Sequence, residues 1–237
     1  MSEIAENILE VQKKIKASCE KSGRRFDDVT LIAVSKTKPF SDLIEAAKAG
    51  ITEFGENRPQ EIRDKYRLLQ NTEYKDKVHF HMIGQLQSNK IKYVYDTTAL
   101  IHSIDSRETA YAVSDFVIKR GSIVPILLEV NAGYENTKSG FYPEDVKKAV
   151  DDIAVLPGLE IKGLMTVAPF VSDPSVNRPV FRTMKELMVD INSENAHNIC
   201  MDILSMGMTN DYEIAVEEGA THVRVGTGIF GKRDYDI

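Results

Sequence analysis

The chain has 237 residues, of which 42% are hydrophobic and 28% are charged, and its formal net charge at pH 7 is -6. This composition is typical of a globular protein that can bury a sizeable core. The acidic balance argues against a general nucleic-acid surface or an anionic-membrane surface, because both need clustered lysine and arginine. We therefore expect a small-molecule partner, with no nucleic acid and no membrane involved.

The two cysteines, Cys19 and Cys200, lie far apart and have no histidine or cysteine neighbours at metal-ligand spacing. The sequence therefore predicts neither a disulfide framework nor a zinc site. The first 30 residues are amphipathic and lack the basic-then-apolar order of a signal peptide, and no stretch reaches the roughly 18 apolar residues that a membrane span requires. These observations favour a cytoplasmic protein.

Short apolar runs alternate with helical patterns along the chain. An opening helix is indicated by apolar residues at three-to-four spacing, namely Ile4, Ile8, Val11 and Ile15. Strands are predicted at 30–36, 52–57, 78–84, 99–105, 124–132, 160–167, 202–208 and 222–231. The first helix after strand one is predicted at 41–49, capped by Ser41 and ended by Gly50. Further helices are predicted from the end of the 52–57 strand to Leu69, at 86–94, at 106–119, after Pro143, at 177–191 and at 211–218.

Eight strands alternating with helices fit a closed (β/α)8 TIM barrel with an extra N-terminal helix better than an open doubly wound sheet. We expect residues 1–237 to form one domain of this kind. Polar residues and glycines fall at or just past the predicted strand ends, where a barrel has its active site. They are Lys36, Asn57, Gly84, Asp105, Asn131, Thr166, Ser205 and Gly226.

Lys36 ends the first predicted strand, in the segment "LIAVSKTKP" (31–39). Because side chains alternate along a strand, Lys36 shares one side with Ile32 and Val34, and it faces the barrel mouth if they face the interior. Desolvation there would lower the pKa of the lysine and provide the free amine that attacks a carbonyl. A lone strand-end lysine can equally extend into solvent, which is the stronger interpretation for Lys38 beside Pro39.

The last two strands end in the glycine-rich segments "SMGM" (205–208) and "GTGIFG" (226–231). The loops after strands seven and eight often bind phosphate in barrels, and the hydroxyls of Ser205 and Thr227 would add donors. Arg224 shares a strand side with Gly226 and needs an anion or a planar partner, although it can instead pair with Glu129. An inward lysine, an inward arginine and a phosphate site together describe a phosphorylated aldehyde, and pyridoxal 5'-phosphate (PLP) meets this description.

Seven ordered motifs also carry a family likeness. They are "LIAVSKTKP", "FGENRPQE" (54–61), "HMIGQLQSNK" (81–90), "SIDS" (103–106), "LLEVNAGYENTKSGF" (127–141), "GLMTVAP" (163–169) and "LSMGMTNDYEIAVEEGATHVRVGTGIFG" (204–231). Together they resemble the pyridoxal phosphate homeostasis protein family, over about residues 4–233. The resemblance implies a fold type III PLP-binding barrel like the N-terminal domain of alanine racemase.

The resemblance also implies roles for individual residues. Lys36 would hold PLP as a Schiff base, and Arg224 would face the pyridine nitrogen. Ser205, Gly226 and Thr227 would hold the phosphate, with Gly207 allowing close approach, while Asn57, Met82 and Met165 would line the cofactor. Thr209 stands where the family often has serine, and we expect it to lie away from the proposed cofactor contacts. A second cofactor site at Lys38, Lys138 or Lys232 is left open.

Little catalysis is expected. An arginine at the ring nitrogen cannot readily supply a proton, so the ring would be a poor electron sink. The resemblance implies that racemases with this barrel take a catalytic acid or base from a second domain. We expect that domain to be absent here, because the chain ends six residues after "IFG". We interpret His81 and His102 as hydrogen-bonded core residues, and Tyr134 and Tyr142 as surface residues.

The sequence thus favours a monomeric PLP carrier in vitamin B6 homeostasis, with apo forms of PLP-dependent enzymes as recipients. Two alternatives stay open. One is a PLP-dependent amino-acid racemase, and the other is a cofactor-free aldolase in which Lys36 attacks a sugar phosphate.

Overall fold

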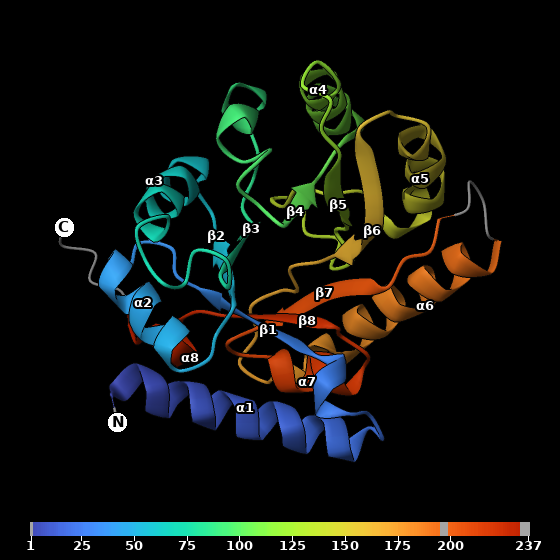
Figure 1. Cartoon of the computed structure of the whole chain (residues 1–237). Coiled ribbons are helices and arrows are strands. Elements are labelled where there is room, and N and C mark those ends of the chain that lie inside the picture. Colours follow the sequence, from blue (N-terminus) through green and yellow to red (C-terminus); the bar gives the residue numbers. More distant parts are fainter. Residues whose placement is uncertain (1, 195–198, 233–237) are drawn as a thin grey trace.

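A computed structural model gives the architecture of residues 2–194 and 199–232. Within these residues, eight parallel strands follow one another around a closed barrel, and β8 pairs with β1 to close it. The predicted (β/α)8 barrel is therefore confirmed (Figure 1). The strands are β1 (Thr30–Val34), β2 (Glu53–Glu56), β3 (His79–Met82), β4 (Leu100–Ile104), β5 (Val124–Glu129), β6 (Leu159–Met165), β7 (Ile203–Met208) and β8 (His222–Val225).

Helices follow most strands, and α1 (Glu3–Lys21) precedes the barrel as predicted. The other α-helices are α2 (Phe40–Lys48), α3 (Pro59–Leu69), α4 (Arg107–Ile118), α5 (Val146–Ala154), α6 (Arg178–Glu194), α7 (Tyr212–Glu217) and α8 (Thr227–Phe230). Short 3-10 turns lie at η1 (Phe26–Asp28), η2 (Ser88–Tyr93), η3 (Pro143–Asp145) and η4 (Pro174–Asn177).

One local prediction, the N-cap of α2, was wrong. Helix α2 begins at Phe40 with Pro39 in the capping position, so Ser41 lies inside the first turn and does not cap it. The fixed φ of proline suits this entry, and Ser41 instead donates to the neighbouring carboxylate of Asp42. The short helix predicted at 86–94 is present as the 3-10 helix η2, which spans Ser88–Tyr93.

The N-terminal helix α1 lies along the outside of the barrel, beside α2, α7 and α8 (Figure 1). Its apolar face is buried at Ile8, Val11 and Ile15, which explains the three-to-four spacing in the sequence. The side-chain amide of Asn7 donates to the carbonyl of Ile229 at 3.0 Å. This helix therefore supports the side of the barrel where the last strand meets the first.

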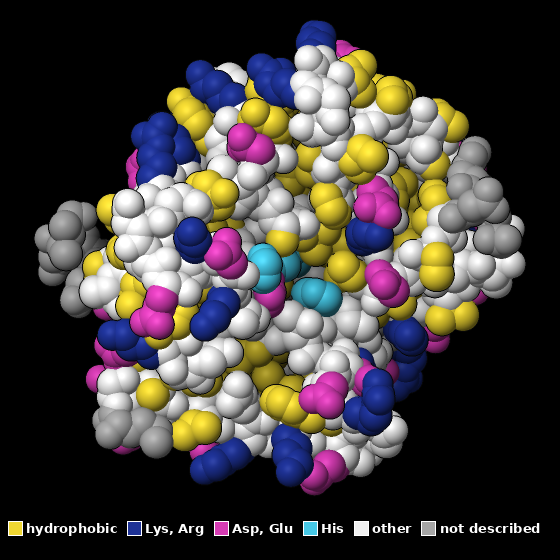
Figure 2. Space-filling model, in the orientation of Figure 1, with side chains coloured by type: hydrophobic (Ala, Val, Ile, Leu, Met, Phe, Trp, Pro, Cys, Tyr) yellow, Lys and Arg dark blue, Asp and Glu magenta, His cyan; other side chains and the backbone are white. Residues whose placement is uncertain are grey.

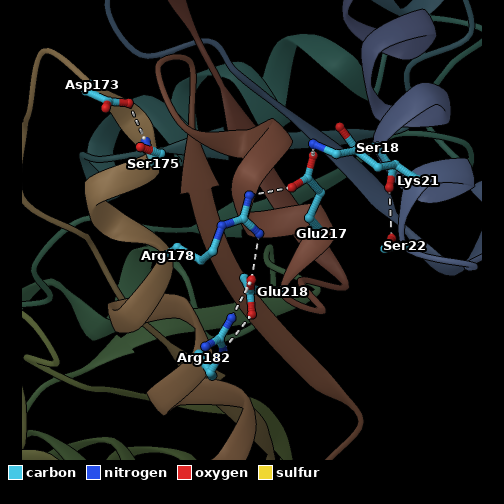
Figure 3. A network of polar contacts seen from close by, with 9 residues as sticks. All are labelled: Ser18, Lys21, Ser22, Asp173, Ser175, Arg178, Arg182, Glu217 and Glu218. Carbon is cyan, nitrogen blue, oxygen red and sulfur yellow. Dashed lines mark hydrogen bonds and ion pairs between the residues drawn. The ribbon is translucent and has the colours of Figure 1, made fainter.

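A network of ion pairs joins α1, α6 and α7 (Figure 3). The guanidinium of Arg178 contacts Glu217 at 2.5 Å and Glu218 at 2.6 Å, while Lys21 contacts Glu217 at 2.6 Å and Arg182 contacts Glu218 at 3.3 Å. Burial alone would raise the pKa of Glu217 and of Glu218. The hydrogen bonds from Lys21, Arg178 and Arg182 outweigh burial and lower both pKa values.

The barrel interior contains a group of buried polar side chains. His81, His102, Ser205 and Arg224 are all buried, and a hydrogen bond joins His102 on β4 to Ser205 on β7. These two strands are not neighbours in the sheet, so the bond crosses the interior. Figure 2 shows histidine side chains gathered at the centre of the face in view, next to acidic and basic side chains.

No helix in the described part of the chain is long and apolar enough to cross a membrane. Among the same residues, no group of three or more histidine, cysteine, aspartate or glutamate side chains could hold a metal ion. Cys19 is buried and Cys200 exposed, and both are free thiols.

Candidate functional site

A pocket of about 480 Å³ lies at the ends of strands β1, β2 and β8. It brings together five residues that the sequence singled out, namely Lys36, Asn57, Arg224, Gly226 and Thr227. The remaining lining residues are Val34, Ile83, Val167, Phe170, Met208, Thr209 and Asn210. An apolar wall with a few convergent polar groups is typical of a cofactor site.

The segment that carries Lys36 is held in a defined turn. Strand β1 ends at Val34, so Lys36 lies two residues past it, and both side chains line the pocket. Thr37 adopts a left-handed φ of 65°, which residues with a Cβ rarely adopt. The N–H of Thr37 donates to Glu61 Oε2 at 2.9 Å, and the N–H of Lys38 donates to the Ser35 carbonyl at 3.0 Å. These bonds fix the backbone on the far side of Lys36.

The near side of the turn is held by a buried ion pair. Lys65 Nζ donates to Glu56 Oε1 at 2.6 Å and to the Ser35 carbonyl at 2.7 Å, and the Ser35 hydroxyl donates to the same Glu56 oxygen at 2.6 Å. Glu56 Oε2, however, is a buried oxygen without a hydrogen-bond partner. Burial raises the pKa of Glu56 to about 7, and Lys65 and Ser35 offset only part of this effect.

Two of the three other lysines considered in the sequence, Lys38 and Lys138, donate to backbone carbonyl oxygens. Lys38 Nζ donates to the carbonyls of Phe230 at 2.7 Å and Lys232 at 3.1 Å, so the expectation that it extends freely into solvent was wrong. Lys138 Nζ contacts Glu135 at 2.5 Å and donates to the carbonyl of Val167 at 3.2 Å. Lys138 therefore ties its own loop to the loop that follows β6.

Arg224 is 4% exposed and lines the pocket. Nη1 donates to Ser205 Oγ at 2.6 Å and Nη2 donates to the Thr166 carbonyl at 2.8 Å. Burial lowers the pKa of Arg224 to about 10, and the more distant carboxylate of Glu129 opposes this shift. Both bonded partners are neutral groups. The guanidinium therefore does not form the direct ion pair with Glu129 that the sequence left open, and no carboxylate among its described contacts neutralises its charge.

The backbone turn at Gly226, where β8 ends and α8 begins, forms another wall of the pocket, and we call it the corner at Gly226. The N–H of Gly226 donates to Thr209 Oγ1 at 3.2 Å, which places Thr209 beside Gly226 and Thr227. The expectation that Thr209 lies away from the proposed contacts was therefore wrong. The signal that could have found it is its position, because Thr209 is the first residue after β7.

Ser205 and Gly207 are not among the lining residues. Ser205 lies in the middle of β7 with no exposed surface, and its hydroxyl is engaged by Arg224 and His102. Gly207 has a φ of 89°, and a Cβ there would lie 2.5 Å from the Cβ of Ala215 in α7. The geometry therefore favours an indirect role for Ser205, and for Gly207 a role in packing α7 against β7.

The remaining candidates also lie outside the pocket lining. Met82 and Met165 are buried, with exposed fractions of 0% and 1%. His81 and His102 are buried and hydrogen-bonded to each other at 2.9 Å, which confirms their interpretation as core residues. Tyr134 and Tyr142 stack on each other at the surface, with ring centroids 5.5 Å apart.

Sequence comparison identifies the family. The profile of the family "Alanine racemase, N-terminal domain" matches residues 3–234. The pyridoxal phosphate homeostasis protein of Aquifex aeolicus is 38% identical over 230 residues, which cover 97% of this chain and 98% of the relative. The chain belongs to the pyridoxal phosphate homeostasis protein family. Its resemblance to that family, seen first in the motifs, is confirmed.

Two solved structures of another protein are also similar to this chain. PipY of Synechococcus elongatus has been solved without PLP, at 31% identity and a TM-score of 0.84, and with PLP bound, at 30% identity and a TM-score of 0.81. Both alignments cover 96% of this chain and 100% of PipY. This chain and PipY therefore share the same fold over nearly their whole lengths.

Proposed function

We propose that this chain binds pyridoxal 5'-phosphate, carries it on Lys36 as a Schiff base, and takes part in intracellular PLP homeostasis with little or no catalysis of its own. The observation that carries the proposal is the convergence of Lys36, Arg224 and the corner at Gly226 on one pocket. The names of the curated relatives and the PLP-bound structure of PipY support it.

The lining fits the three chemical features of PLP. The amine of Lys36 would react with the aldehyde, and Arg224 would donate to the pyridine nitrogen. Thr209, Gly226 and Thr227 would hold the phosphate. Thr227 begins α8, whose first N–H groups have no partner within the helix and attract anions. The N–H of Gly226 donates to the Thr209 hydroxyl, which can in turn donate its own hydrogen to the phosphate. Val34, Ile83 and Val167 provide apolar surface for the ring, and Asn57 lies beside them.

Sparse acid–base chemistry in the pocket supports a carrier over an enzyme. Among the described residues that line the pocket, none is a histidine, aspartate, glutamate, cysteine or tyrosine, and Lys36 is the only amine. Racemisation needs an acid or base on each face of the reacting carbon. Arg224, with a pKa of about 10, stays protonated near neutral pH and acts as a donor only.

The pocket is open at one edge, which suits a protein that releases its cofactor. Two of its apolar lining residues are exposed, Phe170 with 89% and Met208 with 36% of its surface. We propose that the chain acts as a monomeric cytoplasmic domain spanning residues 1–237, and that apo forms of PLP-dependent enzymes are its recipients.

The proposal is tested by titrating the purified protein with PLP and recording visible absorption after dialysis. We expect the wild type to become coloured, the Lys36→Ala variant to stay colourless, and Lys48→Ala, which removes an exposed lysine of α2, to behave like the wild type. The loaded wild type should then reactivate an apo form of a PLP-dependent enzyme. A wild type that takes up no PLP would contradict the proposal.

The two alternatives make different predictions in the same experiment. Sustained turnover of an amino acid that disappears in Lys36→Ala would favour a racemase. A colourless protein that becomes covalently linked to a sugar phosphate on borohydride reduction would favour an aldolase.

A further inference from the structure

A continuous chain of hydrogen bonds crosses the barrel interior and ends on Arg224. It begins at Glu53 Oε2 on β2, which lies 2.8 Å from His81 Nε2 on β3. His81 Nδ1 lies 2.9 Å from His102 Nε2 on β4, and His102 Nδ1 lies 2.9 Å from Ser205 Oγ on β7. Arg224 Nη1 on β8 completes the chain at 2.6 Å from the same oxygen. Every ring nitrogen of the two histidines is used.

The chemistry of its two ends sets the direction of this chain. A guanidinium has donors only, so Ser205 Oγ accepts from Arg224 and its single hydrogen points to His102 Nδ1. A neutral His102 that accepts at Nδ1 carries its hydrogen on Nε2 and donates to His81 Nδ1. His81 then carries its hydrogen on Nε2 and donates to the carboxylate of Glu53. One arrangement of protons therefore satisfies all four bonds with both histidines neutral.

The reverse arrangement is less favourable. A protonated His81 would donate at both nitrogens, and His102 would then donate from Nδ1 to Ser205. The hydroxyl hydrogen of Ser205 would lose the acceptor it has in the chain, because its described hydrogen bonds go only to His102 and Arg224. A protonated His81 would also be a second cation inside the barrel besides Arg224, on a side chain that is only 4% exposed. Burial keeps the pKa of His102 well below its usual value, which agrees with the neutral form.

We propose that Glu53, His81, His102 and Ser205 are positioning residues that fix the guanidinium of Arg224 at the pocket, with the Thr166 carbonyl holding its other nitrogen. This inference rests on the proposed function, in which Arg224 faces the pyridine nitrogen of PLP. The partners of the guanidinium are neutral, so they orient it without cancelling its charge. Ser205 is accordingly assigned to Arg224 and not to the cofactor phosphate.

The direction of the chain is tested on the ligand-free protein by nitrogen NMR of labelled histidine side chains. We expect His81 and His102 both to be neutral with the hydrogen on Nε2. A hydrogen on Nδ1 of His102, or a doubly protonated His81 at pH 7, would overturn the proposed direction. This measurement needs no cofactor, so its outcome is independent of whether the chain binds PLP.

The positioning role is tested with substitutions at His102 and Ser205, which do not line the pocket. Ser205→Ala removes an acceptor from a charged donor, and we expect PLP to bind about 10- to 100-fold more weakly, with a shifted absorption maximum. His102→Phe should act in the same way, whereas His102→Asn retains an acceptor near Nδ1 and should restore most of the affinity. Each variant is first compared with the wild type by circular dichroism and thermal melting.

Ser205→Ala protein that is folded and binds PLP with unchanged affinity and spectrum would overturn the positioning role. So would His102→Asn that binds no better than a folded His102→Phe variant. Failure of the proposed function would look different, because the wild type itself would then not bind PLP.

Discussion

Replacing Gly207 by alanine tests whether this glycine serves helix packing or cofactor binding. Its φ of 89° lies in the left-handed region, which costs a residue with a Cβ about 1–2 kcal/mol. The new methyl group would lie 2.5 Å from the Cβ of Ala215 and 2.9 Å from the Cα of Tyr212, and overpacking of this kind costs about 1–3 kcal/mol. We therefore expect Gly207→Ala to lose about 2–5 kcal/mol, because α7 must move away from β7.

The loss is measured by urea unfolding and by thermal melting, where about 2–5 kcal/mol corresponds to a decrease in Tm of roughly 4–20 °C for a chain of this size. Gly226→Ala is the matched control. A Cβ at Gly226 would lie 3.4 Å from its nearest neighbour, the Val34 carbonyl, so the folded state should tolerate it better while PLP binding weakens. A Gly207→Ala variant that is as stable as the wild type but binds PLP poorly would refute this reasoning.

Two further predictions concern stability. Lys65→Met should cost up to about 3–5 kcal/mol in urea unfolding measured above pH 7, where Glu56, whose pKa is about 7, is ionised and loses its buried partner. The cost should be smaller at lower pH, where Glu56 takes up a proton, and adding Glu56→Gln should recover part of the loss. A single-variant cost below about 1 kcal/mol above pH 7 would contradict this prediction. The pKa values of Glu217 and Glu218 are lower in the folded protein than in the unfolded chain. Their contribution to the free energy of unfolding is therefore present above the unfolded pKa of about 4.3 and is lost as the pH falls through their folded-state pKa values. Arg178→Ala should therefore flatten the acid limb of a plot of Tm against pH, and an unchanged acid limb would argue against the network.

The barrel could be predicted from the sequence because its signal is repeated eight times. Each apolar run of strand length is followed by a helical pattern, and only a few folds accommodate that alternation. Individual boundaries depend on single residues and were less predictable. Ser41 is a good capping residue, yet Pro39 begins the turn earlier because its φ is already suited to a helix.

The candidate site could be predicted where strand ends alone decide position. Lys36 lies two residues after the end of β1 and Gly226 one residue after the end of β8, and both line the pocket. Strand β7 instead continues through Met208, so its middle residue Ser205 stays inside the barrel and Thr209 reaches the pocket. A glycine in the sequence indicates that another group packs closely against the backbone, but it does not show whether that group is a ligand or a neighbouring helix. The sequence could therefore not show that Gly207 faces α7.

The hydrogen-bond chain that reaches Arg224 could not be predicted from the sequence. Its members come from five strands, and His102 and Ser205 meet only because the sheet closes on itself. The interpretation of His81 and His102 as core histidines was correct as far as burial goes. The sequence held no signal for the order in which these side chains are connected.

The most direct test of the account is the position of the covalent bond to the cofactor. The purified protein is loaded with PLP, reduced with borohydride and digested, and the labelled peptide is identified by mass spectrometry. We predict that the reduced cofactor is found on Lys36, in the peptide that contains "LIAVSK". A label on another lysine, or a protein that is fully loaded with PLP yet carries no label after reduction, would contradict the central claim.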